Sequence, residues 1–190
     1  MVAVVSHGQE SSSPARVGRR ASDLSDRSAQ SVVEAQPSVS IVLPTLNERA
    51  YLRDCLDSLL AQDYQNVIEI LVVDGRSNDG TRELAANVGG IVAVLDNERI
   101  SAAAALNVGW RAARGDIVVR ADAHALYATD YVRRCVEVLI ETAADDVGGP
   151  MRAVGTTVFG RAVAAVTSSP FGVGPGRFHF SRVREDVDTV

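Results

Sequence analysis

The sequence predicts an α/β fold, a doubly wound and mostly parallel sheet with helices on both faces. Short apolar runs rich in β-branched residues alternate with stretches whose apolar residues recur at helical spacing. The runs are continuously apolar, as strands buried on both faces are. The chain has 190 residues, of which 46% are hydrophobic and 23% charged, and this is enough for about one domain of this class.

Strands and helices are expected to alternate from residue 39 onward. The expected strands cover residues 39–43, 68–73, 91–95 and 117–120. Pro44 should end the first strand, because proline has no N–H for the ladder. The expected helices cover residues 52–60, 81–86, 102–113 and 132–140. Ser101 is expected to cap the third helix and Gly115 to end it.

The N-terminal stretch has a different composition. Residues 6–36 are rich in Ser, Arg, Ala and Gln and contain few large apolar side chains. Such a segment cannot bury enough surface to offset the entropy lost on ordering. We therefore predict a disordered leader over residues 1–36 and one globular domain over residues 37–190, with a short helix over residues 23–33 as the alternative.

Charge and hydropathy exclude several classes of partner. The net charge of −5 and pI near 5.2 provide no general attraction for nucleic acid or an anionic membrane, so no nucleic-acid partner is expected. The apolar runs are much shorter than the roughly 18 residues of a spanning helix, and no signal peptide is recognisable. We expect a cytoplasmic protein whose Cys55 and Cys135 are reduced core residues rather than a disulfide.

Polar side chains follow each expected strand. In a parallel sheet, the loops at the carboxyl ends of the strands all open at one edge. These loops contain Thr45, Asn47, Glu48, Asp74, Ser77, Asn78, Asp79, Glu98, Arg99, Asp122 and His124. Four such loops at one edge predict a ligand cleft.

Asp122 and His124 are the residues in these loops whose chemistry is most suggestive. They are two residues apart after an apolar strand, so on an extended chain they point to the same side. One oxygen and one nitrogen ligand could then converge on a divalent cation or on a polar ligand. The alternative is that Asp122 begins a turn and His124 is an ordinary loop residue.

Four motifs together resemble family 2 glycosyltransferases. They are SIVLPTLNE at residues 40–48, LVVDGRSNDGT at 71–81, NVGWRAARGD at 107–116 and RADAHA at 120–125. From about Ser38 onward the chain is similar to the branch that contains bacterial succinoglycan-type exopolysaccharide glucosyltransferases. Further similarity lies in GGPMR at residues 148–152 and SPFG at 169–172. The resemblance implies a GT-A fold, of which this chain would be the N-terminal donor-binding portion.

The resemblance also implies a nucleotide-sugar site. Pro44, Thr45 and Glu48 would lie beside the nucleoside, and Asp74 would contact the nucleobase. Many relatives have a second acidic residue after that position, where this chain has glycine. Arg99 and Asn107 match positions that line the nucleotide pocket.

A metal site is implied as well. Asp122 matches the first carboxylate of the family's Asp-x-Asp motif, and His124 stands where the last one would be. Because imidazole binds Mn²⁺ better than Mg²⁺, we expect Mn²⁺ to be preferred, with affinity falling as His124 becomes protonated below about pH 6.5. Alternatively, Asp122 binds the metal alone and His124 only lines the pocket.

The implied reaction is inverting transfer of a sugar from a nucleoside diphosphate, with UDP-hexose the expected donor. The acceptor would be a saccharide or a lipid-linked glycan in exopolysaccharide or cell-surface glycan synthesis. In relatives the general base lies downstream of the metal motif, so we expect it beyond Val190 and assign no catalytic residue. Glu185, Asp186 and Asp188 are less favoured candidates. Membrane association at the cytoplasmic face would depend on segments or partners outside this chain.

Two other functions were considered. The chain could bind a nucleotide sugar without transferring it, because the distal acidic motif is missing. It could also be an unrelated doubly wound protein, but no Gly-x-Gly-x-x-Gly follows the first strand, which disfavours a dehydrogenase, and the absence of lysine disfavours a receiver domain.

Overall fold

The centre of the structure is a six-stranded sheet in the order β4-β3-β2-β5-β1-β6. The computed structural model describes residues 4–6, 36–150, 152–155, 157–167 and 169. The strands are β1 (Val4–Ser6), β2 (Val39–Thr45), β3 (Val67–Asp74), β4 (Val92–Asp96), β5 (Ile117–Arg120) and β6 (Asp146–Val147). Strands β2 to β5 pair in parallel, whereas β1 is antiparallel to both of its neighbours. The mostly parallel sheet is therefore confirmed.

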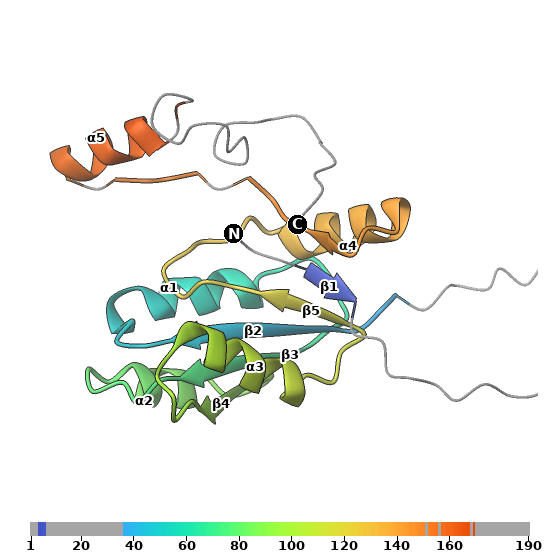
Figure 1. The fold of residues 1–190 in the computed structure, drawn as a ribbon, viewed down its shortest axis with the longest axis horizontal. Helices are drawn as coiled ribbons and strands as arrows, with labels where there is room; N and C mark the ends of the chain where they lie inside the picture. Colours follow the sequence, from blue (N-terminus) through green and yellow to red (C-terminus); the bar gives the residue numbers. More distant parts are fainter. Residues whose placement is uncertain (1–3, 7–35, 151, 156, 168, 170–190) are drawn as a thin grey trace, which may run out of the picture.

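Helices cover both faces of this sheet (Figure 1). The helices of the described residues are α1 (Arg49–Leu60), α2 (Thr81–Ala86), α3 (Ala102–Ala112), α4 (Tyr131–Thr142) and α5 (Val158–Thr167), of which the first four pack against the sheet. Ile41 and Leu43 of β2 belong to the larger core, together with α1, α2 and α4. Val42, between them, belongs to the smaller core beneath α3. This alternation follows from the period of two along a strand, and it makes β2 the centre of a doubly wound fold.

The prediction that Pro44 ends the first strand is wrong, because β2 continues to Thr45. The backbone oxygen of Val42 accepts from the Ala121 N–H at 2.9 Å, so the backbone hydrogen-bonding groups of Val42 point toward β5. Those of Pro44, two residues later, point in the same direction. The pairing of β2 with β5 has ended at Arg120 by that point. The missing N–H of Pro44 therefore costs no ladder hydrogen bond.

Gly115 does not end α3 as a cap. The helix ends at Ala112, and Ala113 is already extended. A Cβ at Gly115 would lie 2.5 Å from the backbone nitrogen of Ser40, so glycine allows the chain entering β5 to pass close to β2. The predicted cap at the other end is confirmed, since the Ser101 side chain accepts from the Ala104 N–H at 3.2 Å.

Three other expectations concern Ile140, the N-terminal leader and the two cysteines. Ile140, expected on the apolar stripe of α4, is 63% exposed, because it falls at the edge of that stripe. Strand β1 lies within the expected leader, where adding a strand satisfies the backbone groups at the free edge of β5. Residues 7–35 lie outside the described residues, so the rest of the leader and the domain boundary stay predictions. Cys55 and Cys135 are buried free thiols, as expected.

Helix α5 stands apart from the sheet in Figure 1 and buries none of its residues. Its Phe159 side chain is 79% exposed. Among the described residues, no helix combines the length and the apolar character needed to cross a membrane.

A buried polar network holds the amino ends of the strands, opposite the polar loops. Glu69 of β3 accepts from Ser40 Oγ at 2.7 Å and from Arg114 Nε at 3.0 Å. Ser40 Oγ accepts in turn from the Gly115 N–H at 2.8 Å. Burial would raise the pKa of Glu69, but the hydrogen bonds from Ser40 and Arg114 outweigh it and lower the pKa. The ionised carboxylate therefore joins β2, β3 and the α3–β5 connection.

Replacing Gly109 by alanine should destabilise the fold. In an unconstrained helix this change is favourable by about 1 kcal/mol, but here the new Cβ would lie 2.3 Å from Val42 Cγ1. We expect a loss of about 1–3 kcal/mol from this overpacking, measured by urea unfolding. Adding Gly109→Ala to a Val42→Ala background should cost much less, and an equal cost on both backgrounds would contradict the proposed clash.

Replacing Glu69 by glutamine should produce a pH-dependent loss of stability. A carboxylate whose folded pKa is lowered stabilises the protein above its unfolded pKa of about 4.3, and that contribution disappears as the pH falls through the folded pKa. The difference in unfolding free energy between wild type and Glu69→Gln should therefore be about 1–3 kcal/mol at pH 7 and shrink below about pH 4. Glu137→Gln, which removes an exposed partner of Arg133, is the matched control and should cost little. A pH-independent penalty for Glu69→Gln would refute this account.

Candidate functional site

A cavity of about 410 Å³ opens at the carboxyl ends of β2 and β5, beside the first turns of α3. This volume lies within the range typical of ligand pockets. Its lining comes from the last residues of β2 and β5, from the loops after β2, β4 and β5, and from α3: Pro44, Thr45, Leu46, Glu48, Asn97, Ile100, Ser101, Ala102, Ala105, Leu106, Arg120, Asp122, Ala123 and His124. Five of the residues predicted for the site therefore share one cavity: Pro44, Thr45, Glu48, Asp122 and His124.

The loop after β2 is held in place by the loop after β3. The Glu48 N–H donates to Thr81 Oγ1 at 2.9 Å, and the Arg49 N–H donates to Asp79 Oδ2 at 3.1 Å. These acceptors satisfy donors at the start of α1, where a helix has no internal partners. The hydroxyl of Thr81 also donates to Asp79 and lowers the pKa of that carboxyl. The Glu48 side chain does not cap its own helix and instead lines the cavity.

The backbone of Asp122 is fixed by one buried and one partly buried side chain. Its N–H donates to the Tyr127 hydroxyl at 2.7 Å, and its carbonyl oxygen accepts from Cys55 Sγ at 3.5 Å. Burial, with a smaller effect from the charge of Asp122, raises the pKa of Cys55 to about 12. The thiol therefore stays protonated at neutral pH and remains able to donate. Burial also raises the pKa of Tyr127, so its hydroxyl is neutral as well.

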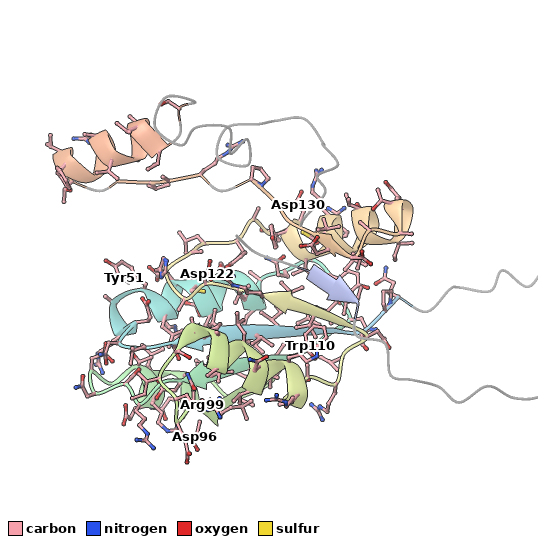
Figure 2. The ribbon with its side chains drawn as sticks, in the orientation of Figure 1. Tyr51, Asp96, Arg99, Trp110, Asp122 and Asp130 are labelled. Atoms are coloured by element: carbon pink, nitrogen blue, oxygen red, sulfur yellow. The ribbon has the colours of Figure 1, made fainter. Side chains whose placement is uncertain are left out.

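The side chain of Asp122 forms an ion pair inside the cavity. Arg120 Nη2 donates to Asp122 Oδ1 at 3.1 Å. The two side chains are 38% and 27% exposed, respectively, so the pair is partly shielded from water. Figure 2 shows Asp122 toward β5, while Arg99 and Asp96 lie together on the β4 side of the sheet.

His124 joins the loop after β5 to the loop after β2. Its Nδ1 lies 3.3 Å from Glu48 Oε1. An ionised Glu48 can only accept, so Nδ1 carries the proton in this contact and Nε2 is the nitrogen with a lone pair for a ligand. The His124 side chain is 66% exposed and Glu48 only 23%. The carboxylate thus orients the ring from inside the cavity.

Three predicted residues lie outside the cavity lining. Asp74 is 1% exposed, and its carboxylate accepts from the N–H and the hydroxyl of Ser77 at 3.1 and 2.6 Å. Arg99 and Asn107 are exposed, Asn107 on α3 beyond the turns that reach the cavity. The nucleotide-contacting roles of Asp74, Arg99 and Asn107 stay predictions.

Nine of the lining residues were not assigned from the sequence, and three of them have distinctive features. Asn97 is 3% exposed, and its Nδ2 donates to the backbone oxygen of Ser101 at 3.0 Å. Ile100 has a φ of 58°, which is uncommon for a β-branched residue, and it presents its side chain at the cavity. Arg120 was visible in the motif RADAHA but was given no role. The sequence feature that could have identified Arg120 is a charged residue at the end of an otherwise apolar strand, two residues before a predicted metal ligand.

The cavity offers few ligands for a metal ion. Within the described residues, no three His, Cys, Asp or Glu side chains form a group that could hold one. Asp122 and His124 supply one carboxylate and one imidazole. This mixed pair suits a transition ion that takes its remaining ligands from a bound anion and water.

Comparison with known proteins supports the fold and the family. The family description "Glycosyl transferase family 2" matches residues 40–180. The succinoglycan biosynthesis protein ExoA of Rhizobium meliloti (strain 1021) is 36% identical over 139 residues, covering 70% of this chain and 42% of that protein. Glycosyltransferase AglE of Haloferax volcanii is 30% identical over 118 residues, covering 60% of this chain and 39% of AglE. The chain thus spans about two fifths of the length of these relatives.

Solved structures show the same fold. The mannosyltransferase PcManGT from Pyrobaculum calidifontis, in complex with GDP-Man and Mn²⁺, has a TM-score of 0.51 and 30% identity, over 71% of this chain and 41% of PcManGT. S. aureus TarS 1-349 with UDP-GlcNAc has a TM-score of 0.56 and 24% identity, over 63% of this chain and 36% of TarS. The α/β fold of GT-A type is therefore confirmed. The chain belongs to glycosyltransferase family 2.

Proposed function

We propose that this chain is the donor-binding portion of an inverting glycosyltransferase that moves a hexose from UDP-hexose to a saccharide or lipid-linked acceptor. The observation that carries the proposal is the shared cavity of Glu48, Asp122 and His124, three residues from two family motifs. The name of ExoA favours exopolysaccharide or cell-surface glycan synthesis. TarS was solved with UDP-GlcNAc and PcManGT with GDP-Man, so a nucleoside diphosphate is the common element of the donors.

The residues of the chain would hold and orient the donor. Pro44 and Thr45, at the end of β2, are proposed to lie against the nucleoside, with Asp74, Arg99 and Asn107 as further contacts. Tyr127 and Cys55 fix the backbone of Asp122, so its carboxylate needs little reorganisation when a ligand arrives. Such preorganisation is a large part of how enzymes stabilise developing charge.

A divalent cation is part of the proposal, with Mn²⁺ favoured over Mg²⁺. Asp122 and His124 would hold it, and when bound it would neutralise charge developing on the diphosphate leaving group. Glu48 keeps the proton of His124 on Nδ1, which leaves Nε2 as the ligand atom. The mixed donor set fits Mn²⁺ better than Mg²⁺, which prefers oxygen ligands.

The general base is proposed to lie beyond Val190, in the portion of the relatives that this chain does not span. Glu185, Asp186 and Asp188 lie outside the described residues. A nucleotide-sugar-binding role without transfer is the second candidate, because the residues that line the cavity could hold a donor but none of them is assigned as a general base. Release of UDP from UDP-glucose, assayed with and without candidate acceptors, separates the two. We further propose that the protein is cytoplasmic and that its full-length form acts at the cytoplasmic face of the membrane.

The wild-type chain should bind UDP and UDP-glucose in a Mn²⁺-dependent manner. Because a cation held by Asp122 and His124 would neutralise charge on the diphosphate, isothermal titration should give at least about tenfold tighter UDP binding with Mn²⁺ than with EDTA. Asp122→Asn should abolish this difference, whereas Asp54→Asn, an equal change of charge at an exposed site on α1, should preserve it. Folded wild-type protein that binds UDP equally well with and without Mn²⁺ would contradict the proposed metal site.

Changing His124 to aspartate should alter the choice of metal. The substitution replaces a nitrogen ligand with a carboxylate, so the ratio of Mn²⁺-supported to Mg²⁺-supported UDP affinity should fall by about tenfold. His124→Gln, which is neutral and a weak ligand, should instead weaken binding with both ions. If the Mn²⁺ to Mg²⁺ ratio is unchanged in His124→Asp, His124 only lines the pocket.

A further inference from the structure

We propose that Arg120 is a charge switch that makes binding of the cation and binding of the diphosphate depend on each other. This inference rests on the proposed function, since it concerns the same cavity. In the structure, Arg120 is paired with Asp122, the carboxylate proposed to hold the cation. The guanidinium therefore occupies the position of a positive charge that a metal would otherwise supply.

The position of Arg120 supports an exchange of partners. It is the last residue of β5, and its side chain lines the cavity. The ion pair uses Nη2, whereas Nε is buried and has no hydrogen-bond partner within the described part of the chain. A buried donor without a partner raises the free energy of the state that contains it. The pair with Asp122 therefore leaves the guanidinium incompletely satisfied, and a ligand with more acceptors could satisfy it better.

A diphosphate has the chemistry to take Arg120 away from Asp122. Guanidinium groups bind phosphate oxygens through pairs of parallel hydrogen bonds, which a single Nη2 contact to a carboxylate does not provide. Once Arg120 turns to the phosphates, Asp122 is released to the cation. The negative charge of the diphosphate also offsets the repulsion between the guanidinium and the cation.

The consequence is coupling between two ligands. Without nucleotide, the cation must compete with Arg120 for Asp122 and sits near its positive charge, so the empty site binds metal weakly. Without metal, Arg120 must give up its ion pair with Asp122 in order to reach the diphosphate. Each ligand therefore strengthens the other, and the coupling must be equal in both directions.

The test measures Mn²⁺ alone, UDP with saturating Mn²⁺, and uridine by isothermal titration of the whole chain. Arg120→Met removes the charge and keeps much of the side-chain length. We expect it to bind Mn²⁺ alone about tenfold more tightly, because a repelling charge is lost. It should bind UDP with Mn²⁺ about tenfold more weakly, because a phosphate contact is lost. Uridine, which has no phosphate, should bind as it does to wild type.

Two further variants provide controls. Arg111→Met removes the same charge from an exposed position on α3 that does not line the cavity, and it should change none of the three affinities. Arg120→Lys keeps the charge without the planar fork, so it should bind Mn²⁺ alone as wild type does and bind UDP more weakly. Arg120→Lys also tests the proposal if Arg120→Met does not fold.

The opposite signs of the two effects distinguish this role from a structural one. If Arg120→Met weakens both Mn²⁺ and UDP binding, or changes neither, the inference is overturned while the proposed function stands. An unchanged UDP affinity in Arg120→Lys would overturn it as well. If the wild-type chain itself fails to bind UDP with Mn²⁺, the proposed function falls, and this inference with it.

Discussion

The fold and the site both depend on the parallel pairing of β2 with β3 on one side and β5 on the other. Because the three strands run in one direction, the loops that follow β2 and β5 must open at the same edge, where the cavity lies. The central strand is buried on both faces, so it cannot shift its register without exposing Ile41 or Val42. The relative positions of Glu48 and Asp122 are therefore set by the core rather than by the loops themselves.

The sequence correctly predicted that the loops after β2, β4 and β5 reach the site, but the loop after β3, which was also predicted, contributes no residue to the cavity lining. Nor did the sequence predict which side chains of these loops face the cavity. Strand ends can be read from apolar periodicity, and this placed Thr45, Glu48, Asp122 and His124 correctly at one edge. The direction of a loop side chain depends on local donors instead. Asp74 was expected just after its strand and is in fact the last residue of β3, and Ser77, three residues later, supplies two donors to its carboxylate. Such local capture is common for aspartate in turns and leaves no signature in hydrophobic patterning.

The contrast between hydrophobic patterning and local backbone contacts also explains where the observed fold differs from the predicted one. The apolar periodicity predicted α2 and β5 with the bounds that the structure has, because their limits coincide with turn-forming residues. It did not predict that β2 would continue through Pro44. Whether a strand can continue through proline depends on whether a neighbouring strand needs the missing N–H as a donor, and the β5 pairing has already ended at that point. Nor did it predict β1, whose pairing with β5 and β6 is made by backbone groups. Contacts through the backbone are nearly independent of side-chain identity and so are hidden from composition.

The close approach of α3 to β2 connects the stability of the fold to the shape of the site. A side chain at Gly109 would overlap Val42, so only glycine lets the helix lie this near the sheet. Within the two preceding turns, the same helix contributes Ala102, Ala105 and Leu106 to the cavity wall. A rigid helix transmits a displacement along its length, so anything that lifts α3 at Gly109 must also shift this wall relative to the loops after β2 and β5. The width of the cavity is thus determined by packing in the smaller core, and residues that never contact a ligand can alter what the cavity holds.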